Sequence, residues 1–170
     1  MSKDLLVVID MQNDFVTGAL GTAEAQAMLP ALSALAHGWQ GPVIFTRDTH
    51  TPDYLNTQEG RNLPVPHCIR DTPGWQIVEE LRDLTEGAPI FDKPTFGSTR
   101  LAHYLAKEEP DSVTFCGVCT GICVISNALL AKAALPETPI RVAASCCACV
   151  TPQSHQTALD AMKLCQIEMV

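Results

Sequence analysis

The chain has 170 residues, of which 46% are hydrophobic and 18% are charged, and its formal net charge is −8 at pH 7. This composition is typical of a folded globular protein and excludes a disordered chain, and we expect residues 1–170 to form a single domain. No cluster of Lys or Arg indicates a nucleic-acid partner, and the apolar run from Leu5 to Ile9 is too short for a membrane span or a signal peptide. We therefore expect a cytoplasmic protein with reduced cysteines that acts on a small molecule and has no membrane partner.

Apolar periodicity and end signals predict alternating strands and helices. In chain order, they are a strand at 5–9, a helix at 22–36, a strand at 42–46, a short helix at 75–82, a strand at 88–91, a helix at 98–106, a strand at 113–115, a helix at 122–133, a strand at 140–143, a helix at 151–164 and a strand at 167–170. The first strand is continuously apolar, which is typical of a central parallel strand covered on both faces. Thr22 and Thr151 suit helix starts, whereas Pro30 implies a kink or a later start in the first helix. The alternation predicts a mostly parallel sheet with helices on both faces.

A long segment at 47–74 is predicted to be a loop, and a loop of this length in a compact domain usually has a function. It carries Asp48, His50 and His67. One carboxylate and two imidazoles suit a divalent ion such as zinc. The alternative is that Asp48 is a turn residue and His67 a packed histidine.

The stretch from Phe115 to Val124 predicts a strand, a tight turn containing Gly117 and the start of a helix. Cys123 would lie in the first turn of that helix, where unpaired N–H groups and the helix dipole favour an anion. A cysteine in such a place has a lowered pKa and is more often the nucleophilic thiolate. The alternative is a small buried thiol without a chemical role.

Asp10 and Lys93 come directly after two other predicted strands. Because parallel strands end at the same edge of a sheet, both side chains can converge with Cys123. A carboxylate can take the thiol proton, an ammonium can stabilise negative charge, and a thiolate can attack a carbonyl carbon. Taken singly, Asp10 could equally be a loop cap and Lys93 a solvated lysine.

Short segments spread over nearly the whole chain carry a family resemblance. They are VVIDMQNDF (7–15), TRDTH (46–50), PHC (66–68), TPGW (72–75), KPTFGST (93–99) and GVCTGICV (117–124). Together they resemble the isochorismatase-like cysteine hydrolases, a superfamily that includes the nicotinamidases. The resemblance implies an α/β fold of three α-β-α layers, with a six-stranded parallel sheet in the order 3-2-1-4-5-6.

The resemblance also implies a mechanism. The family triad of Asp, Lys and Cys corresponds to Asp10, Lys93 and Cys123, and the implied oxyanion hole is formed by the backbone N–H groups of Cys119 and Cys123, with a cis peptide between Val118 and Cys119. The implied reaction is cleavage of a small-molecule amide C–N bond through a thioester on Cys123, with no cofactor required. The alternatives are an isochorismatase-type vinyl ether hydrolase and a non-catalytic member that acts as a binding or assembly partner. Relatives are usually oligomers, so we expect a homo-oligomer.

Two positions depart from the nicotinamidase pattern. At the position that best matches Tyr54, several nicotinamidases carry another metal-site histidine. At the position of Pro64, they tend to have a tryptophan that lines the ring pocket. Both departures argue against nicotinamide as the substrate. We expect Phe15, Tyr54 and Trp75 to line the substrate pocket.

Overall fold

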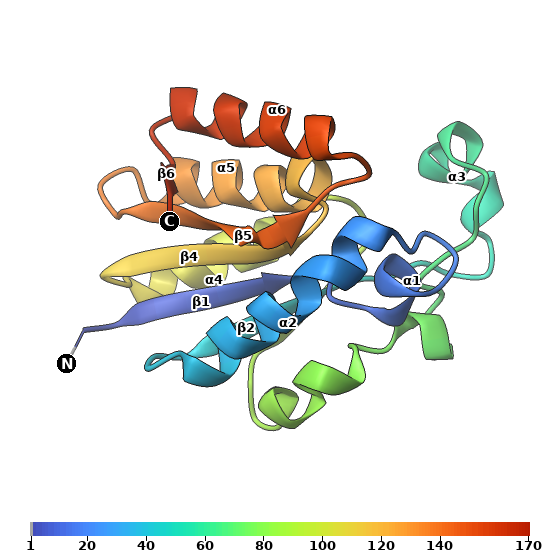
Figure 1. The fold of residues 1–170 in the computed structure, drawn as a ribbon, viewed down its shortest axis with the longest axis horizontal. Helices are drawn as coiled ribbons and strands as arrows, with labels where there is room; N and C mark the ends of the chain where they lie inside the picture. The colour runs from blue at the N-terminus through green and yellow to red at the C-terminus, as the bar shows by residue number, and fades with distance from the viewer. Residues whose placement is uncertain (1) are drawn as a thin grey trace.

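The computed structural model describes residues 2–170, which are built around one six-stranded parallel sheet (Figure 1). The strands are β1 (Asp4–Ile9), β2 (Val43–Asp48), β3 (Ile90–Lys93), β4 (Ser112–Val118), β5 (Ile140–Ala148) and β6 (Glu168–Met169). They lie in the order β3-β2-β1-β4-β5-β6, and every neighbouring pair is parallel. The expected α/β fold and strand order are therefore confirmed.

Helices cover both faces of this sheet (Figure 1). They are α1 (Asn13–Val16), α2 (Ala23–Gly38), α3 (Gln58–Asn62), α4 (Thr99–Glu108), α5 (Ile125–Ala134) and α6 (Pro152–Leu164). One apolar core joins the sheet to α4, α5 and α6, and a second core joins the other face to α2. In β1, Val7 lies in the first core and its neighbour Val8 in the second, which explains why this strand is apolar throughout.

The helix α2 begins where the sequence predicts and passes Pro30 without interruption. The side chain of Thr22 accepts a hydrogen bond from the N–H of Ala25 and so caps the helix start. Proline has no N–H, so the Gln26 carbonyl lacks the hydrogen bond that residue 30 would otherwise donate. Pro30 is exposed, and water can reach this side of the helix. The helix then continues to Gly38.

The chain between β2 and β3 is more ordered than the sequence predicts. Besides α3, it contains 3₁₀ turns at Tyr54–Asn56, Pro73–Trp75 and Glu79–Thr85, so the expected continuous helix at 75–82 is wrong. The intervening residues pair with the segment after β1, because the N–H of Val78 donates to the Met11 carbonyl and Gln76 accepts from Asn13. These long-range hydrogen bonds hold residues 76–78 out of a helix.

Within residues 2–170, no helix is both long and apolar enough to cross a bilayer. The helix α2 has 16 residues, and a transmembrane helix needs about 20 apolar ones.

Candidate active site

Three side chains from distant parts of the chain meet at the carboxyl edge of the sheet. Asp10 follows β1, Lys93 ends β3, and Cys123 lies in a single π-helical turn, η4 (Thr120–Val124), between β4 and α5. The Nζ of Lys93 is 2.6 Å from Oδ2 of Asp10 and 3.4 Å from Sγ of Cys123. The structure thus brings together the three residues that the sequence analysis singles out as catalytic candidates.

Backbone geometry and buried hydrogen bonds fix the orientation of these groups. Asp10 adopts a left-handed backbone conformation, with φ of 51°, and its Oδ1 accepts a 2.7 Å hydrogen bond from the hydroxyl of Thr46. Lys93 also donates to the Thr95 carbonyl at 3.1 Å. The three candidates are at most 5% exposed, so their charges act on one another with little screening by water.

Burial and mutual charge set the ionisation of the three groups. Burial raises the pKa of Asp10, although the charge of Lys93 opposes it. Burial works to lower the pKa of Lys93, but the charge of Asp10 and the hydrogen bond to it outweigh this effect, and the pKa is raised. Burial, the Asp10 charge and a hydrogen bond to Asp10 raise the pKa of Cys123, against the effect of Lys93.

The raised pKa of Cys123 corrects the expectation from the sequence. The sequence places Cys123 in a first helical turn, which predicts a lowered pKa. In the structure the sulfur is desolvated and faces a carboxylate, and both effects disfavour the thiolate. The resting thiol is therefore protonated, and chemistry at sulfur needs a base beside it.

The turn that carries Cys123 is held by its own backbone and by one buried amide. The Val118–Cys119 peptide is cis, and the Cys119 carbonyl accepts from the N–H groups of Ile122 and Val124. The side chain of Asn127 donates to the Cys123 carbonyl at 2.7 Å. Asn127 also bonds residues of the 93–99 segment, since it accepts from the Ser98 N–H at 2.9 Å and donates to the Phe96 carbonyl at 3.0 Å.

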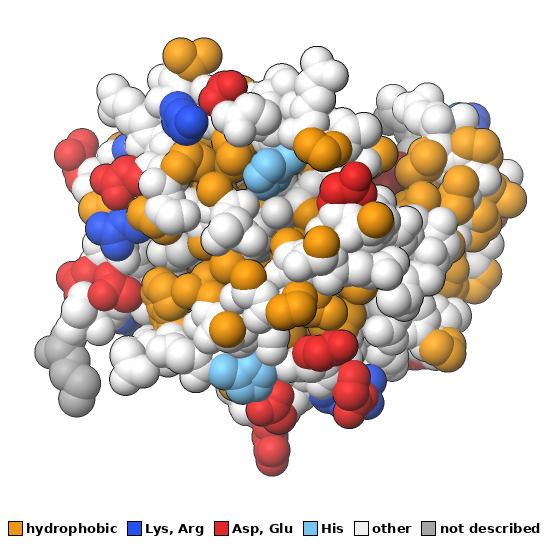
Figure 2. Space-filling view, in the orientation of Figure 1, with side chains coloured by type: hydrophobic (Ala, Val, Ile, Leu, Met, Phe, Trp, Pro, Cys, Tyr) orange, Lys and Arg blue, Asp and Glu red, His pale blue; other side chains and the backbone are white. Residues whose placement is uncertain are grey.

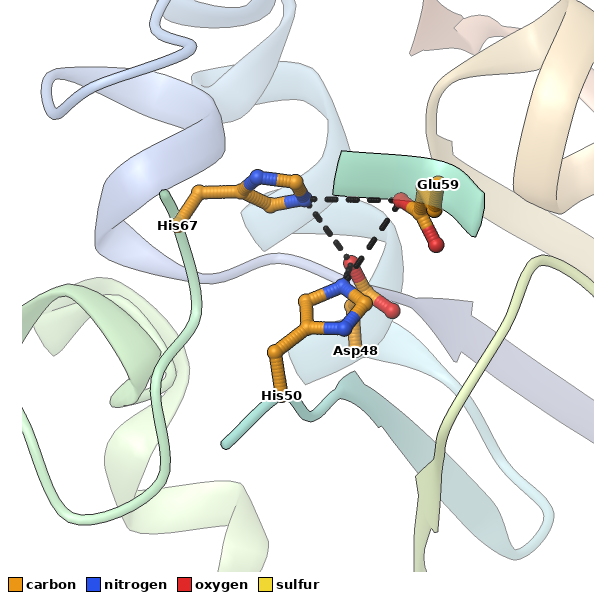
Figure 3. Close-up of side chains that lie close together, drawn as sticks. All are labelled: Asp48, His50, Glu59 and His67. Atoms are coloured by element: carbon orange, nitrogen blue, oxygen red, sulfur yellow. Dashed lines mark hydrogen bonds and ion pairs between the residues drawn. The ribbon is translucent and has the colours of Figure 1, made fainter. Parts of the chain in front are cut away.

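A second cluster lies beside the first and holds two carboxylates and two imidazoles (Figure 3). Nε2 of His50 and of His67 lie 3.0 Å and 3.3 Å from Oδ2 of Asp48. Oε1 of Glu59 lies 3.7 Å and 3.8 Å from the same two nitrogens. Asp48 Oδ1 is 3.8 Å from the Nζ of Lys93, so this cluster adjoins the first one.

The donor atoms of this cluster fit a divalent cation. One donor atom from each residue lies within 4.8 Å of the others, and buried Asp48 Oδ1 has no hydrogen-bond partner among the described residues. Nδ1 of His67 lies 2.8 Å from the Val65 carbonyl, which can only accept, so Nδ1 carries the proton. In neutral His67 the Nε2 lone pair then faces the two carboxylates, an arrangement that suits a metal.

The electrostatics of the cluster also favour a bound cation. Burial works to raise the pKa of Asp48, but the contacts with the imidazoles of His50 and His67 and the charge of Lys93 outweigh it and lower the pKa. Burial and the Asp48 charge raise the pKa of Glu59. A cation between these groups would relieve the repulsion of the two carboxylates. Asp, Glu and His are all ligands that zinc accepts.

Glu59 belongs to this cluster, and the sequence analysis misses it. It is carried by α3, whose start is capped by the Thr57 side chain through the Gly60 N–H at 3.0 Å. A threonine followed by Gln58 and Glu59 is a helix-start signal that could have placed the carboxylate on an ordered element.

Two residues that the sequence analysis places in the pocket lie elsewhere. The buried ring of Tyr54 packs edge-on against the rings of His50 and His67, and its hydroxyl donates to the Leu63 carbonyl at 2.8 Å. Trp75 lies under the guanidinium of Arg47, 3.8 Å from the ring centre. Neither lines the cavity that reaches Cys123. Tyr54 thus supports the two histidines of the second cluster, whereas Trp75 packs against Arg47.

A buried amide outside both clusters holds the backbone of Asp48. Oε1 of Gln12 accepts from the Asp48 N–H at 2.8 Å. Its Nε2 donates to the carbonyls of Asp48 and Trp75, each at 2.9 Å. The sequence analysis assigns Gln12 no role.

A cavity of about 380 Å³ opens onto both clusters. Its lining includes Cys123 from the first cluster and Asp48, Glu59 and His67 from the second. Of the three expected pocket residues, Phe15 does line the cavity. The remaining walls are mostly apolar. Four of the lining side chains are also exposed at the surface, namely Leu63, Phe96, Ile122 and Val150. In Figure 2, hydrophobic side chains gather at the edge of the molecule where Figure 1 places α3.

Comparison with known proteins gives consistent matches over the chain. Residues 4–170 match the family described as the isochorismatase domain. A nicotinamidase/pyrazinamidase from Mycobacterium tuberculosis is 27% identical over 191 aligned positions, which cover 97% of each chain. A nicotinamidase from Saccharomyces cerevisiae is 27% identical over 174 positions, which cover 74% of this chain and 80% of that one.

Solved structures match in fold as well. The pyrazinamidase of Pyrococcus horikoshii in complex with zinc is 28% identical and gives a TM-score of 0.84, covering 99% of this chain and 98% of that chain. The nicotinamidase/pyrazinamidase of Bacillus subtilis is 25% identical and gives a TM-score of 0.88, covering 99% of both chains.

Proposed function

The chain belongs to the isochorismatase domain family, and from this premise we propose that it is a cysteine-dependent amidohydrolase that cleaves the C–N bond of a small carboxamide. One observation carries the proposal. The ammonium of Lys93 contacts both the Asp10 carboxylate, at 2.6 Å, and the Cys123 sulfur, at 3.4 Å, beside a cavity. A base, a cation and a thiol in mutual contact are the groups that acyl transfer to sulfur requires.

The reaction begins with proton transfer from Cys123 to Asp10, because the thiol is protonated at rest. The thiolate then forms a bond to the amide carbonyl carbon, and the carbonyl oxygen takes the electron pair. The backbone N–H groups of Cys119 and Cys123 stabilise this oxyanion, while Lys93 stabilises charge at sulfur and at Asp10. The tetrahedral adduct collapses to a thioester as the C–N bond breaks, and the leaving nitrogen takes the proton from Asp10.

Water then hydrolyses the thioester by the same sequence of steps. Asp10 takes a proton from the attacking water, and a second tetrahedral adduct collapses to a carboxylic acid with return of that proton to the Cys123 sulfur. The raised pKa of Asp10 supports both steps, because a carboxylate with a higher pKa is a stronger base.

We assign a divalent cation such as zinc to Asp48, His50, Glu59 and His67. The bound ion would supply a Lewis acid at the cavity wall, close to the substrate. Three of the four ligands line the cavity, whereas His50 lies behind them and contacts Tyr54. The zinc content of protein purified without a histidine tag tests the assignment.

The charge of the cavity supports an uncharged substrate. The charged side chains among its lining residues are the acidic Asp48 and Glu59, and the nearby ammonium of Lys93 is paired with Asp10. The assigned cation would balance these two carboxylates. A carboxylate-bearing vinyl ether would find no lysine or arginine among the described lining residues to pair with, which favours a neutral carboxamide.

A panel of primary carboxamides, monitored by ammonia release and by the intact mass of the protein, tests the proposal. We expect at least one amide to release ammonia and to leave a transient acyl group on Cys123. A chain that forms no thioester with any amide and hydrolyses none would instead be a vinyl ether hydrolase or a non-catalytic member of the family.

A further inference from the structure

Thr120 carries the one oxygen-bearing side chain of the turn at 118–124. Its side chain is fully buried, and a buried hydroxyl needs a hydrogen-bond partner. That partner is His155 on α6, whose Nδ1 lies 2.6 Å from Oγ1 of Thr120. A short hydrogen bond therefore ties the turn to a helix that is remote from it in sequence.

The helix that carries His155 is well anchored at this end. Thr151 and Ser154 cap its start reciprocally, each side chain accepting from the other's backbone N–H. The turn packs directly on the helix, because a Cβ added at Gly121 would lie 3.4 Å from the Cβ of Ala158. The His155 ring is thus presented to the turn from a rigid element.

The protonation of His155 suits the bond to Thr120. Burial lowers the pKa of His155, so the imidazole is neutral near pH 7. Neutral Nδ1 can accept the proton of the Thr120 hydroxyl, which fixes the rotamer of that side chain.

The position of Thr120 controls two groups of the proposed mechanism. Its backbone directly follows Cys119, whose N–H is one oxyanion donor, and it begins the π-helical turn that carries Cys123. His155 does not itself line the cavity and so does not touch the substrate.

We propose that His155 is a positioning residue, which acts through Thr120 to hold the oxyanion-binding N–H groups in place relative to the sulfur of Cys123. The inference rests on the proposed function. Oxyanion donors work only when aimed at the developing charge, and loss of one donor slows acyl transfer by about 10²–10³-fold. A displaced turn should therefore slow steps that form an oxyanion and leave other reactions of the thiol unchanged.

Two reagents distinguish loss of oxyanion stabilisation from a general loss of thiol reactivity, without knowledge of the natural substrate. Acetylation of Cys123 by p-nitrophenyl acetate passes through a tetrahedral oxyanion. Alkylation by iodoacetamide is a direct displacement at a saturated carbon and develops none. Both rates are measured at Cys123 by peptide mass mapping, with Cys123→Ala protein as the background for the other cysteines.

We expect His155→Leu and Thr120→Val to slow acetylation of Cys123 by about tenfold or more, with unchanged alkylation and an unchanged concentration of half-saturation by the ester. His155→Asn, which places an acceptor near the position of Nδ1, and Thr120→Ser, which keeps the hydroxyl, should restore most of the rate. The double variant of His155→Leu with Thr120→Val should be no slower than either single one, because both remove the same contact.

Gln156→Leu is the matched control, since this exposed neighbour lies on the same helix turn. Equal slowing of acetylation and alkylation in His155→Leu would overturn the proposal and mark the contact as merely structural. Normal acetylation in His155→Leu would also overturn it. If the unmodified protein is alkylated but never acetylated at Cys123, the proposed function falls and this inference falls with it.

Discussion

The ion pair between Asp10 and Lys93 is fully buried, and Asp10→Asn breaks it with almost no change of shape. The variant removes the proposed base and the negative charge that faces Cys123. Lys93 keeps its hydrogen bond to the Thr95 carbonyl at 3.1 Å and lies 3.8 Å from Asp48. The perturbation is therefore electrostatic.

The stability effect follows from the burial of both charges. Removing one partner of a buried pair costs about 3–5 kcal/mol, because the other charge is left in a site without water. For a chain of 170 residues this lowers the midpoint of thermal unfolding by roughly 6–20 °C. We expect the lower half of this range, since without Asp10 the burial of Lys93 favours its neutral form.

The chemical effects should run in opposite directions. Amide hydrolysis should fall by about 10²–10⁴-fold, because no group remains to take the thiol proton and return it to the leaving nitrogen. Alkylation of Cys123 by iodoacetamide at pH 7 should become faster, because the Asp10 charge, which raises the pKa of this thiol, is gone. Ammonia release, peptide mass mapping and thermal unfolding measure the three quantities.

Asp92→Asn is the matched control, since this carboxylate directly precedes Lys93 but pairs near the surface with Arg47, at 2.7 Å. Because this pair is partly exposed to water, Asp92→Asn should cost less stability than Asp10→Asn, and it should leave both reactions unchanged. Slower alkylation in Asp10→Asn would refute the argument that the Asp10 charge raises the pKa of Cys123. Amide turnover close to that of the unmodified protein would refute Asp10 as the base.

Three further predictions concern the nucleophile, the cation and the fold. Cys123→Ala should abolish ammonia release and thioester formation while the protein still unfolds cooperatively; residual turnover would assign the nucleophile elsewhere. Glu59→Gln should lower the zinc bound per chain, as measured by elemental analysis, whereas the exposed Glu86→Gln should not; equal zinc in both would remove Glu59 from the ligand set. Thr151→Ala removes the cap of α6 and should cost about 1 kcal/mol, or a shift of about 2–4 °C in thermal unfolding. The exposed Thr157→Ala, inside the same helix, should shift it less.

The fold class and the three residues of the first cluster could be predicted from local patterns in the sequence, whereas the strand order was implied by the family resemblance. A strand buried on both faces must be apolar throughout, as 5–9 is, and a helix start needs a capping side chain, as Thr22 and Thr151 provide. Since parallel strands all end at one edge, residues that follow different strands were expected to meet there.

The tertiary structure alone decided the features that depend on distant neighbours. Residues 76–78 are extended because they bond to the segment after β1, and Glu59 joins the histidines because α3 folds over them. The ionisation of Cys123 likewise depends on residues that are distant in sequence. A helix start near Cys123 is visible in the sequence, but the removal of water and the facing Asp10 carboxylate are not, and these raise the pKa of the thiol. Local preferences reach only a few residues along the chain, whereas desolvation and charge act through space between residues that folding brings together.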